Sequence, residues 1–285
     1  MSHTRRIRAV YKGQPTLEGA GVRLNRVFGH AEVPTFDPFL LLDDFRSRNP
    51  RDYLAGFPWH PHRGIETVTY MLQGKVEHGD SLGNSGIIGP GDMQWMTAGS
   101  GIIHQEMPKA GGDGSMGGLQ LWVNLPAEQM MTPPRYREIR AADIPGVEEE
   151  NGVSVKVISG HYGSLQGPAR DIVADPSYFD VSVPAGATFR HEVEEGHTVL
   201  AYVLEGEGKF DPAASRTVRG GELVLFDTGT DVSITGARDT LRLLFISGRP
   251  LGEPVAWYGP IVMNTQEELQ LAFQEYRNGT FIKDG

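Results

Sequence analysis

The chain contains no cysteine, which excludes disulfide bonds, thiol nucleophiles and zinc–thiolate sites. Basic residues are also scarce, since 26 lysines and arginines against 36 acidic residues give a formal net charge of −10. This balance lacks the basic surface expected of a protein that binds nucleic acid directly. The cluster of Arg5, Arg6 and Arg8 is too small to change this conclusion, and we interpret it as a solvated N-terminal arm.

Long apolar runs are absent as well. The N-terminal residues lack the apolar stretch of a signal peptide, and the run D-P-F-L-L-L-D-D-F at 37–45 is far too short to cross a bilayer. The lack of cysteine also fits a reducing compartment. We therefore expect a cytoplasmic protein that contacts neither a membrane nor nucleic acid directly.

Glycine and proline are abundant and spread along the chain, with 37 and 19 copies in 285 residues. Between them lie short segments that alternate or run apolar over strand length, which predicts an all-β fold of antiparallel sheets. The segments that we expect to form strands include 67–72, 119–125, 153–159, 178–183, 198–204, 223–226 and 240–246. A helix is expected at 265–277, between an acidic first turn and Asn278-Gly279, with a weaker candidate at 127–131.

The chain also repeats itself. The segment T-Y-M-L-Q-G ending at Gly74 matches A-Y-V-L-E-G ending at Gly206, and P-G-D-M-Q-W-M matches G-G-E-L-V-L-F about 130 residues later. Pro133-Pro134 and the acidic segment around 141–152 mark the link between the two copies. The repeat predicts an N-terminal domain at 1–135 and a C-terminal domain at 136–285 that includes the helix.

Two short motifs contain the residues suited to bind a metal. His60 and His62 are two residues apart, as are His104 and Glu106, so each pair lies on one face of a β-strand. If both strands border one barrel interior, three imidazoles and a carboxylate converge there. Burying that carboxylate without a partner would be expensive, whereas a divalent first-row metal suits this set of ligands. The ligand types admit Fe, Ni, Co, Mn, Cu or Zn.

The repeat predicts that the second domain has lost these ligands. Shifting the four positions by the repeat offsets of 132 and 130 residues leads to Glu192, Glu194, Ile234 and Gly236. The second copy has two other histidines, His191 and His197, on the opposite parity. We expect their rings to point out of the domain interior.

Taken together, the motifs resemble those of the pirin family of bicupins. The matching segments are 21–27, 37–45, F-P-W-H-P-H-R-G-I-E-T-V at 57–68 and G-I-I-H-Q-E at 101–106, with 253–269 and 276–281 typical of the long form of the family. The resemblance implies two tandem cupin barrels. It also implies one metal ion, usually Fe(II), in the first barrel, bound by the residues at His60, His62, His104 and Glu106.

The position of the carboxylate ligand has an alternative. Cupins in general take it from the first motif, where Glu66 has the right spacing, whereas pirins use the position of Glu106. We favour Glu106 and expect Glu66 to orient a histidine or to line the cavity. For a substrate pocket we expect Phe57, Glu66, Gln120 and Trp122, because an inward-facing Gln120 amide needs a partner. We interpret His78 as a turn residue on the surface, and Asp43-Asp44 as solvated charge.

The resemblance implies two functions of different classes. The first is a quercetin (flavonol) 2,3-dioxygenase that uses O2, in which Glu106 serves as a ligand and as the base that removes the enol proton. The alternative is a non-catalytic, iron-dependent redox sensor that binds a transcription regulator or a metabolic enzyme. We favour the dioxygenase, because the sequence has no flavin or nicotinamide fingerprint and ring cleavage by O2 needs no external reductant.

Overall fold

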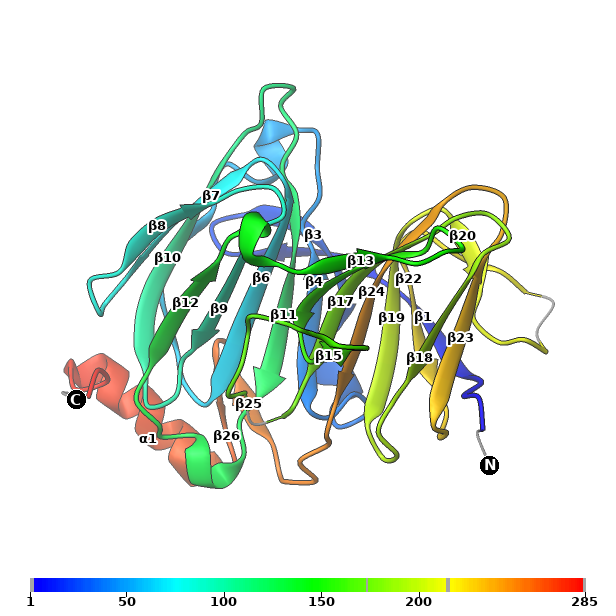
Figure 1. Cartoon of the computed structure of the whole chain (residues 1–285). Helices are drawn as coiled ribbons and strands as arrows, with labels where there is room; N and C mark the ends of the chain where they lie inside the picture. Colours follow the sequence, from blue (N-terminus) through cyan, green and yellow to red (C-terminus); the bar gives the residue numbers. More distant parts are fainter. Residues whose placement is uncertain (1–2, 173, 214–215, 284–285) are drawn as a thin grey trace. The chain divides into compact units, whose positions relative to one another are not determined.

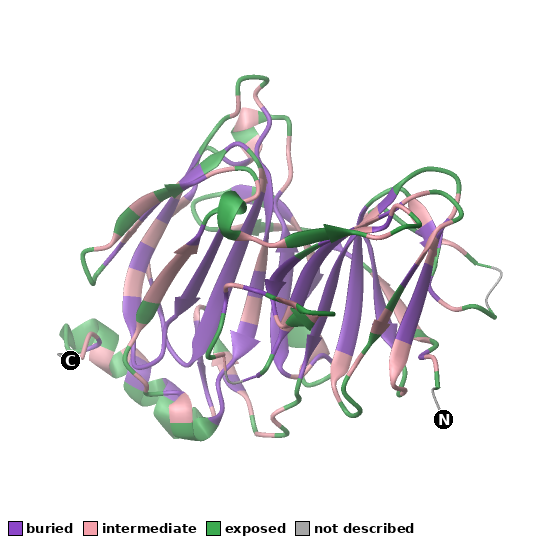
Figure 2. Cartoon of the chain, in the orientation of Figure 1, coloured by how far each residue is buried: buried purple, intermediate pink, exposed green. Residues whose placement is uncertain are grey.

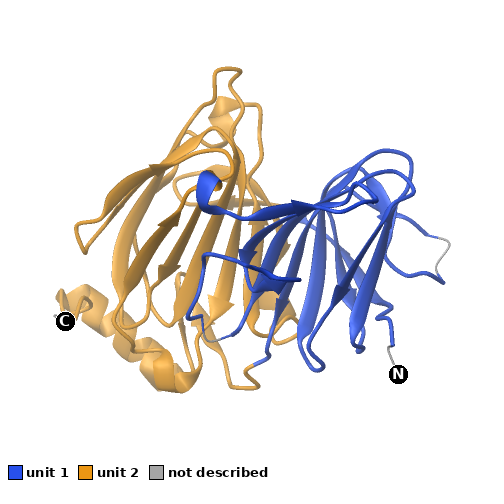
Figure 3. Ribbon diagram, viewed as in Figure 1, with its two compact units in different colours: residues 1–13, 142–250 blue, residues 14–141, 251–285 orange. Residues whose placement is uncertain are grey.

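A computed structural model describes residues 3–172, 174–213 and 216–283. These residues form antiparallel strands joined by tight turns, followed by a C-terminal α-helix (Figure 1). They divide into two compact units, shown in Figure 3: unit 1 comprises residues 1–13 and 142–250, and unit 2 comprises residues 14–141 and 251–285. Each unit contains one seven-stranded and one four-stranded sheet, so the predicted all-β fold of two cupin barrels is confirmed.

The two units are not two consecutive halves of the chain. Unit 1 corresponds to the predicted range 136–285 but also contains residues 1–13. Unit 2 corresponds to the predicted range 1–135 but also contains residues 251–285. The first strand, β1 (Ile7–Lys12), pairs with β22 (Glu222–Phe226) and thereby completes the large sheet of unit 1. The C-terminal helix, α1 (Gln266–Asn278), contacts the last hairpin of unit 2.

Unit 2 contains both predicted metal-binding motifs. Its large sheet has the strand order β12 (Arg135–Ile139), β9 (Met93–Thr97), β6 (Ile65–Gln73), β11 (Gly117–Asn124), β4 (Phe39–Asp44), β3 (Val22–Phe28) and β2 (Gln14–Glu18). Its small sheet has the order β5 (Phe57–His62), β10 (Ile102–Lys109), β7 (Lys75–Asp80) and β8 (Ser85–Ile88). A separate hairpin follows unit 1 in the chain, formed by β25 (Ala256–Tyr258) and β26 (Ile261–Met263).

Unit 1 repeats this plan. Its large sheet has the order β1, β22, β19 (Thr198–Glu205), β24 (Leu241–Gly248), β17 (Ser177–Val183), β14 (Ser154–Ser159) and β13 (Gly146–Glu148). Its small sheet has the order β18 (Thr188–Glu192), β23 (Asp231–Gly236), β20 (Glu207–Lys209) and β21 (Val218–Arg219), and a short hairpin joins β15 (His161–Tyr162) to β16 (Leu165–Gln166). Across both units, the described residues also form four 3-10 turns: η1 (His30–Glu32), η2 (Pro50–Asp52), η3 (Ala127–Gln129) and η4 (Ala141–Asp143).

The strands bury most of their residues, as Figure 2 shows. In unit 1 every second residue of neighbouring strands enters a single apolar core. Val153, Val155 and Val157 are examples from one strand region, and Val199, Ala201 and Val203 from another. The core of unit 1 therefore follows directly from the alternating pattern of its strands.

The predicted helix forms within one residue of its expected bounds. Thr265 accepts a hydrogen bond from the Glu268 backbone N–H, and the Glu268 side chain accepts one from the Thr265 N–H. This reciprocal capping box fixes the helix N-terminus, and Gly279 ends the helix in the left-handed conformation (φ 74°) that glycine adopts without strain. The weaker helix candidate at 127–131 is only the 3-10 turn η3.

Arg63, which follows the H-P-H motif, joins α1 to the barrel of unit 2. Its buried guanidinium donates to Glu275 Oε2 at 2.7 Å and to the Phe281 carbonyl at 2.8 Å. The neighbouring Gly64 has φ 78°, and a side-chain Cβ there would lie 1.8 Å from the Val262 carbonyl oxygen. The R-G of the motif is thus explained by docking of the C-terminal segment. Among the described residues, no helix is both long and apolar enough to cross a membrane.

Candidate metal centre

The three predicted histidine ligands gather at one point inside unit 2. Strands β5 and β10 pair antiparallel, with His60 directly opposite His104. One ring nitrogen from each of His60, His62 and His104 lies within 4.8 Å of the others. The ring centroids are 4.4 to 5.0 Å apart. The period-two spacing of H-P-H and the register of the two strands therefore place the imidazoles together as the sequence predicted.

Hydrogen bonds fix which nitrogens of His60 and His62 can bind a metal. His60 Nδ1 lies 2.8 Å from the Pro58 carbonyl oxygen, and His62 Nδ1 lies 2.9 Å from the Pro260 carbonyl oxygen. Because a carbonyl only accepts, each Nδ1 carries the proton and each Nε2 keeps its lone pair. The two Nε2 atoms are 3.1 Å apart, so two lone pairs face one another. A cation between them would turn this repulsion into attraction.

His104 gives a second indication that these three histidines bind an ion. Both of its ring nitrogens are buried, and neither has a hydrogen-bond partner in the described structure. Burial lowers the pKa of His62 to about 3, with a further contribution from His60, and holds the pKa of His104 well below its usual value. The imidazoles are therefore neutral near pH 7 and available as ligands. The set fits a divalent first-row metal ion.

Glu106 lies on the same strand as His104 but is not one of the grouped ligand atoms. Its buried carboxylate lines the adjacent cavity, and Oε1 accepts a hydrogen bond from Thr69 Oγ1 at 3.0 Å. Burial raises the pKa of Glu106 to about 7, although the Thr69 hydrogen bond acts in the opposite direction. A carboxyl group with this pKa can exchange a proton at neutral pH.

A cavity of about 720 Å³ opens beside the histidines, within the size range of small-molecule pockets. Its walls are mostly apolar. Of the predicted pocket residues, Phe57, Gln120 and Trp122 line it, and Trp122 packs edge-on against His62 with centroids 5.2 Å apart. The Gln120 amide shares its partner with Glu106, because Thr69 Oγ1 also lies 2.7 Å from Gln120 Oε1 and its one hydroxyl proton is divided between the two acceptors.

Glu66, the alternative carboxylate, does not line this cavity. It is buried on β6, where Thr97 Oγ1 donates to Glu66 Oε1 at 2.7 Å. Thr69, three residues further along the strand, faces the cavity, so Glu66 lies on the opposite face. The motif spacing does not bring Glu66 beside the histidines, because the chain turns at Arg63-Gly64 and passes from the small sheet into the large one.

Three predictions about surface residues were wrong. Arg5 does not lie in a solvated arm but is buried, and its guanidinium donates to backbone carbonyls of unit 1, among them those of His197 and Gly229. Asp43 is not solvated but buried in the cavity wall, where Arg26 donates to both of its oxygens at 2.9 and 2.7 Å. Burial raises the pKa of Asp43 to about 6 against the lowering effect of Arg26.

The cavity also receives residues 257–260, whose role sequence reasoning missed. The alternating pattern of G-V-R-L-N-R at 21–26 could have predicted that Arg26 faces the same side as Val22 and Leu24. No local pattern predicted that residues 257–260 reach the cavity.

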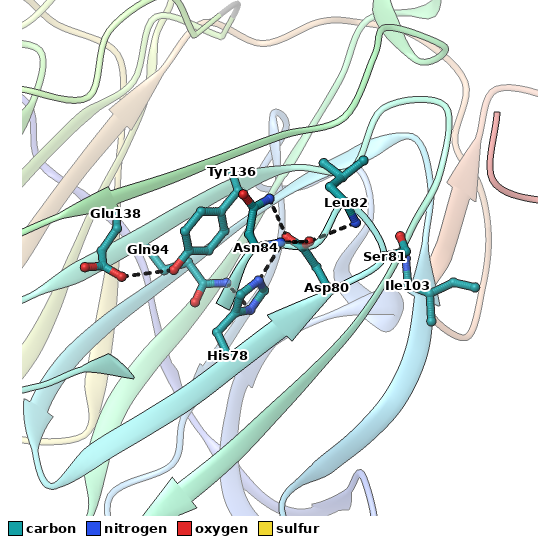
Figure 4. A network of polar contacts seen from close by, with 9 residues as sticks. All are labelled: His78, Asp80, Ser81, Leu82, Asn84, Gln94, Ile103, Tyr136 and Glu138. Carbon is teal, nitrogen blue, oxygen red and sulfur yellow. Dashed lines mark hydrogen bonds and ion pairs between the residues drawn. The ribbon is translucent and has the colours of Figure 1, made fainter. Parts of the chain in front are cut away.

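His78 is a core residue of β7 and not a turn residue (Figure 4). Its Nε2 lies 3.1 Å from Asp80 Oδ2, and Gln94 Nε2 lies 3.1 Å from His78 Nδ1. The ring stacks on Tyr136, whose hydroxyl donates to Glu138 Oε2 at 3.2 Å. His78 lies opposite Glu106 in the strand register. This polar network therefore forms the wall behind the candidate ligands.

The corresponding positions in unit 1 are occupied differently from what the sequence predicted. Ile234 and Gly236 do correspond to His104 and Glu106, but Ile234 lies opposite Phe189 and not Glu192. The connection from β18 to β19 has five residues, whereas the connection from β5 to β6 has two. The repeat offset is therefore 132 after this connection but only 129 before it. His191 therefore takes the place of His62.

The His191 ring also points into unit 1 and not out of it. Its centroid lies 5.1 Å from that of Phe179 and 5.3 Å from that of Phe245, both of which belong to the core. Burial lowers the pKa of His191 to about 4. With Phe189 and Ile234 as neighbours, unit 1 has one imidazole where unit 2 has three.

Comparison with known proteins agrees with this geometry. The Pirin family model matches residues 21–123, and the model of the Pirin C-terminal cupin domain matches residues 178–282. The chain belongs to the pirin family. This pirin is 44% identical to the "Putative quercetin 2,3-dioxygenase" of Pseudomonas aeruginosa, over 98% of this chain and 99% of that protein. It is 47% identical to a pirin-like protein of Caulobacter vibrioides, over 95% and 97% of the two chains.

Among solved structures, this pirin is similar to the quercetin 2,3-dioxygenase of Acinetobacter baumannii. The TM-score is 0.88 at 34% sequence identity, and the match covers 98% of this chain and 99% of that one. The likeness extends over both units. The candidate metal centre thus belongs to a fold that is shared with a protein described as a dioxygenase.

Proposed function

We propose that this pirin is a metal-dependent dioxygenase that opens the central ring of flavonols such as quercetin, with release of carbon monoxide. The observation that supports this most directly is the pair of Nε2 lone pairs of His60 and His62, which face one another beside the partnerless nitrogens of His104. Three neutral imidazoles next to a largely apolar cavity of about 720 Å³ suit a metal ion and a flat aromatic substrate.

We assign the metal to His60, His62 and His104, with Glu106 as the fourth ligand. Bound there, a divalent first-row ion, which we propose to be Fe(II), would supply Lewis acidity and redox chemistry toward O2. The relatives named as quercetin 2,3-dioxygenases support this choice of reaction. The carboxylate of Glu106 is close enough to the cavity to act on a group that enters beside the histidines.

The side chains of this pirin divide the remaining tasks. Thr69 donates to Glu106 Oε1, so we assign Oε2 to accept the proton of the substrate enol. Burial raises the pKa of Glu106 in the metal-free protein, and a bound cation would lower it again, so that the carboxylate is ionised and can accept this proton. Phe57 and Trp122 flank the cavity, where they hold the aromatic rings and keep water away.

The test is oxygen consumption by the Fe(II)-loaded protein with quercetin. We expect one carbon monoxide released for each O2 consumed, since both oxygen atoms enter the ring-opened product. The Glu106→Gln variant should lower kcat by at least about 100-fold, because general-base catalysis contributes about 10²–10⁴. Metal analysis of each preparation separates the loss of the base from the loss of the ion.

Two outcomes would contradict the proposal. The first is a preparation that holds one equivalent of metal and consumes no oxygen with any flavonol. The second is turnover that persists unchanged in a His62→Ala variant without metal. A binding partner that distinguishes Fe(II) from Fe(III) protein, together with absent turnover, would instead favour the redox-sensor function.

A further inference from the structure

A row of polar side chains crosses the cavity-facing side of the large sheet in unit 2. The strand register places them opposite one another across five neighbouring strands, in the order Gln94, Thr69, Gln120, Asp43 and Arg26. Residues opposite one another in a ladder project from the same face of a sheet. The last four of them line the cavity. We call these five residues the polar row.

The corresponding row of unit 1 is entirely apolar. Its members, from strands in the same sheet positions, are Val224, Ala201, Phe245, Phe179 and Val157. All of them belong to the buried core of unit 1. The same sheet is thus complete without a polar group at any of these positions, so the fold does not require the polar row.

Arg26 and Asp43 form one end of the row, three and two strands away from Thr69. The guanidinium of Arg26 donates twice to Asp43 and lies 2.8 Å from Glu18, which also lines the cavity. Two carboxylates share one cation, so the cluster is acidic. Arg26 occupies two of the roughly four acceptor positions of the Asp43 carboxylate. The remaining acceptor positions can accept a hydrogen bond from a hydroxyl group, whereas the negative charge of the cluster repels an anion.

Burying such charges in a wall that also contains Val22, Leu24 and Leu41 has an energetic cost. A buried ion pair is often no more stabilising than apolar residues of the same size. The apolar row of unit 1 shows that apolar residues fit this sheet. The charges therefore point to a use in binding and not in folding.

Spacing indicates what this end of the cavity binds. Asp43 lies two strands from Thr69, which holds Glu106, and two strand spacings amount to about 10 Å. A flat molecule of two or three rings spans such a distance. Between the two ends, Trp122 and Leu41 supply apolar surface for the rings.

We propose that Asp43, held by Arg26, accepts a hydrogen bond from a phenolic hydroxyl on the pendant ring of the substrate and so selects polyhydroxylated flavonols. This inference rests on the proposed function, since it assumes that the enol end of the flavonol lies at Glu106. It assigns specificity to Asp43, which the sequence alone suggested was solvated, and to its partner Arg26.

The experiment compares three flavonols with two, one and no hydroxyl groups on the pendant ring: quercetin, kaempferol and galangin. Equilibrium binding is measured with metal-loaded protein in the absence of O2, so that no turnover occurs. Wild-type protein should bind quercetin at least about tenfold more tightly than galangin, as expected for a hydrogen bond to a buried charged acceptor. The Arg26→Met/Asp43→Leu double variant should bind the two within about twofold, with the galangin Kd unchanged.

The double variant removes both charges, so it leaves no unpaired buried arginine that could unfold the protein. Asp44→Asn is the matched control, because Asp44 also pairs with an arginine, Arg46, but does not line the cavity. This control should keep the wild-type preference. A folded double variant that still prefers quercetin tenfold, or a wild-type protein without preference, would overturn the inference.

The two proposals fail in different ways. If none of the three flavonols binds, the proposed function is wrong, and the assignment of Asp43 with it. If quercetin is preferred and the preference depends on Asp43, but metal-loaded protein consumes no O2, the assignment of Asp43 holds and the proposed reaction is wrong.

Discussion

Units 1 and 2 share a strand order but differ in what fills the interior. In unit 1, core side chains from the five inner strands of the large sheet meet in a single apolar cluster, which includes Phe179 and Phe245. In unit 2, the strands at the same positions carry Asp43 and Gln120, and a cavity of about 720 Å³ remains. The difference shows that apolar side chains alone can fill the interior face of this cupin sheet. The polar groups of unit 2 therefore serve chemistry, at some expense in stability.

The largest effect should come from making the metal centre of unit 2 resemble unit 1. In His104→Ile, the imidazole is replaced by the residue type found at Ile234. We expect metal affinity to fall by more than about 100-fold, because even residues that only orient ligands are worth about 10–100-fold. Metal content after dialysis measures this. In metal-free protein the melting temperature should not fall, since a buried imidazole without hydrogen-bond partners in the described structure is removed.

The control for this variant is the reverse substitution at the corresponding position of unit 1. Ile234→His should leave the metal content of the protein unchanged, because Phe189 stands opposite Ile234 and supplies no ligand. One bound equivalent of metal in His104→Ile would show that these histidines are not the site.

The second prediction concerns pH and His191, the half-buried histidine that packs against the core of unit 1. The folded protein holds the pKa of His191 at about 4, whereas an unfolded chain has about 6.5. Between these values the unfolded state binds more protons, so stability rises with pH and is lost as pH falls. His191→Phe should remove up to about 3 kcal/mol of this dependence.

Denaturant unfolding at pH 7.5 and pH 4.5 measures the effect as the difference between wild type and variant. Any packing penalty of the larger ring is independent of pH and cancels in that difference. Parallel pH curves for the two proteins would show that the His191 ring is not buried in the core as described.

The smallest effect is expected in the polar row. Thr69→Ala introduces the residue type that unit 1 has at Ala201 and removes the hydrogen bond to Glu106. We expect metal affinity to fall about tenfold, at the lower end of the range for residues that orient ligands. Thr69→Ser keeps the hydroxyl and should stay within about threefold of wild type. Metal titration that fails to distinguish the alanine and serine variants would contradict a positioning role.

Local patterns predicted much of the fold and the centre of the site. The alternating pattern predicted the strands, and the capping residues Thr265 and Glu268 fit the predicted start of the helix. The H-P-H motif places His60 and His62 on the same side as soon as it forms a β-strand. These predictions succeeded because each depends on residues that are close in sequence.

Properties that depend on distant pairing could not be predicted in this way. The face of Glu66 depends on a change of sheet at Gly64, and the place of His191 depends on three additional residues in one connection. Asp43 looked solvated because only the register with Gln120 reveals that it faces a cavity. Repeat offsets are reliable inside a strand and fail across loops of different length.

The bond from His62 to the Pro260 carbonyl has a consequence for biosynthesis. Pro260 follows all of unit 1 in the chain, so translation must pass through the other unit before this imidazole acquires the acceptor that sets its tautomer. Likewise β1 has to wait for β22, more than two hundred residues later. Closing such long loops is slow, so unit 2 cannot be completed until all of unit 1 has been synthesised.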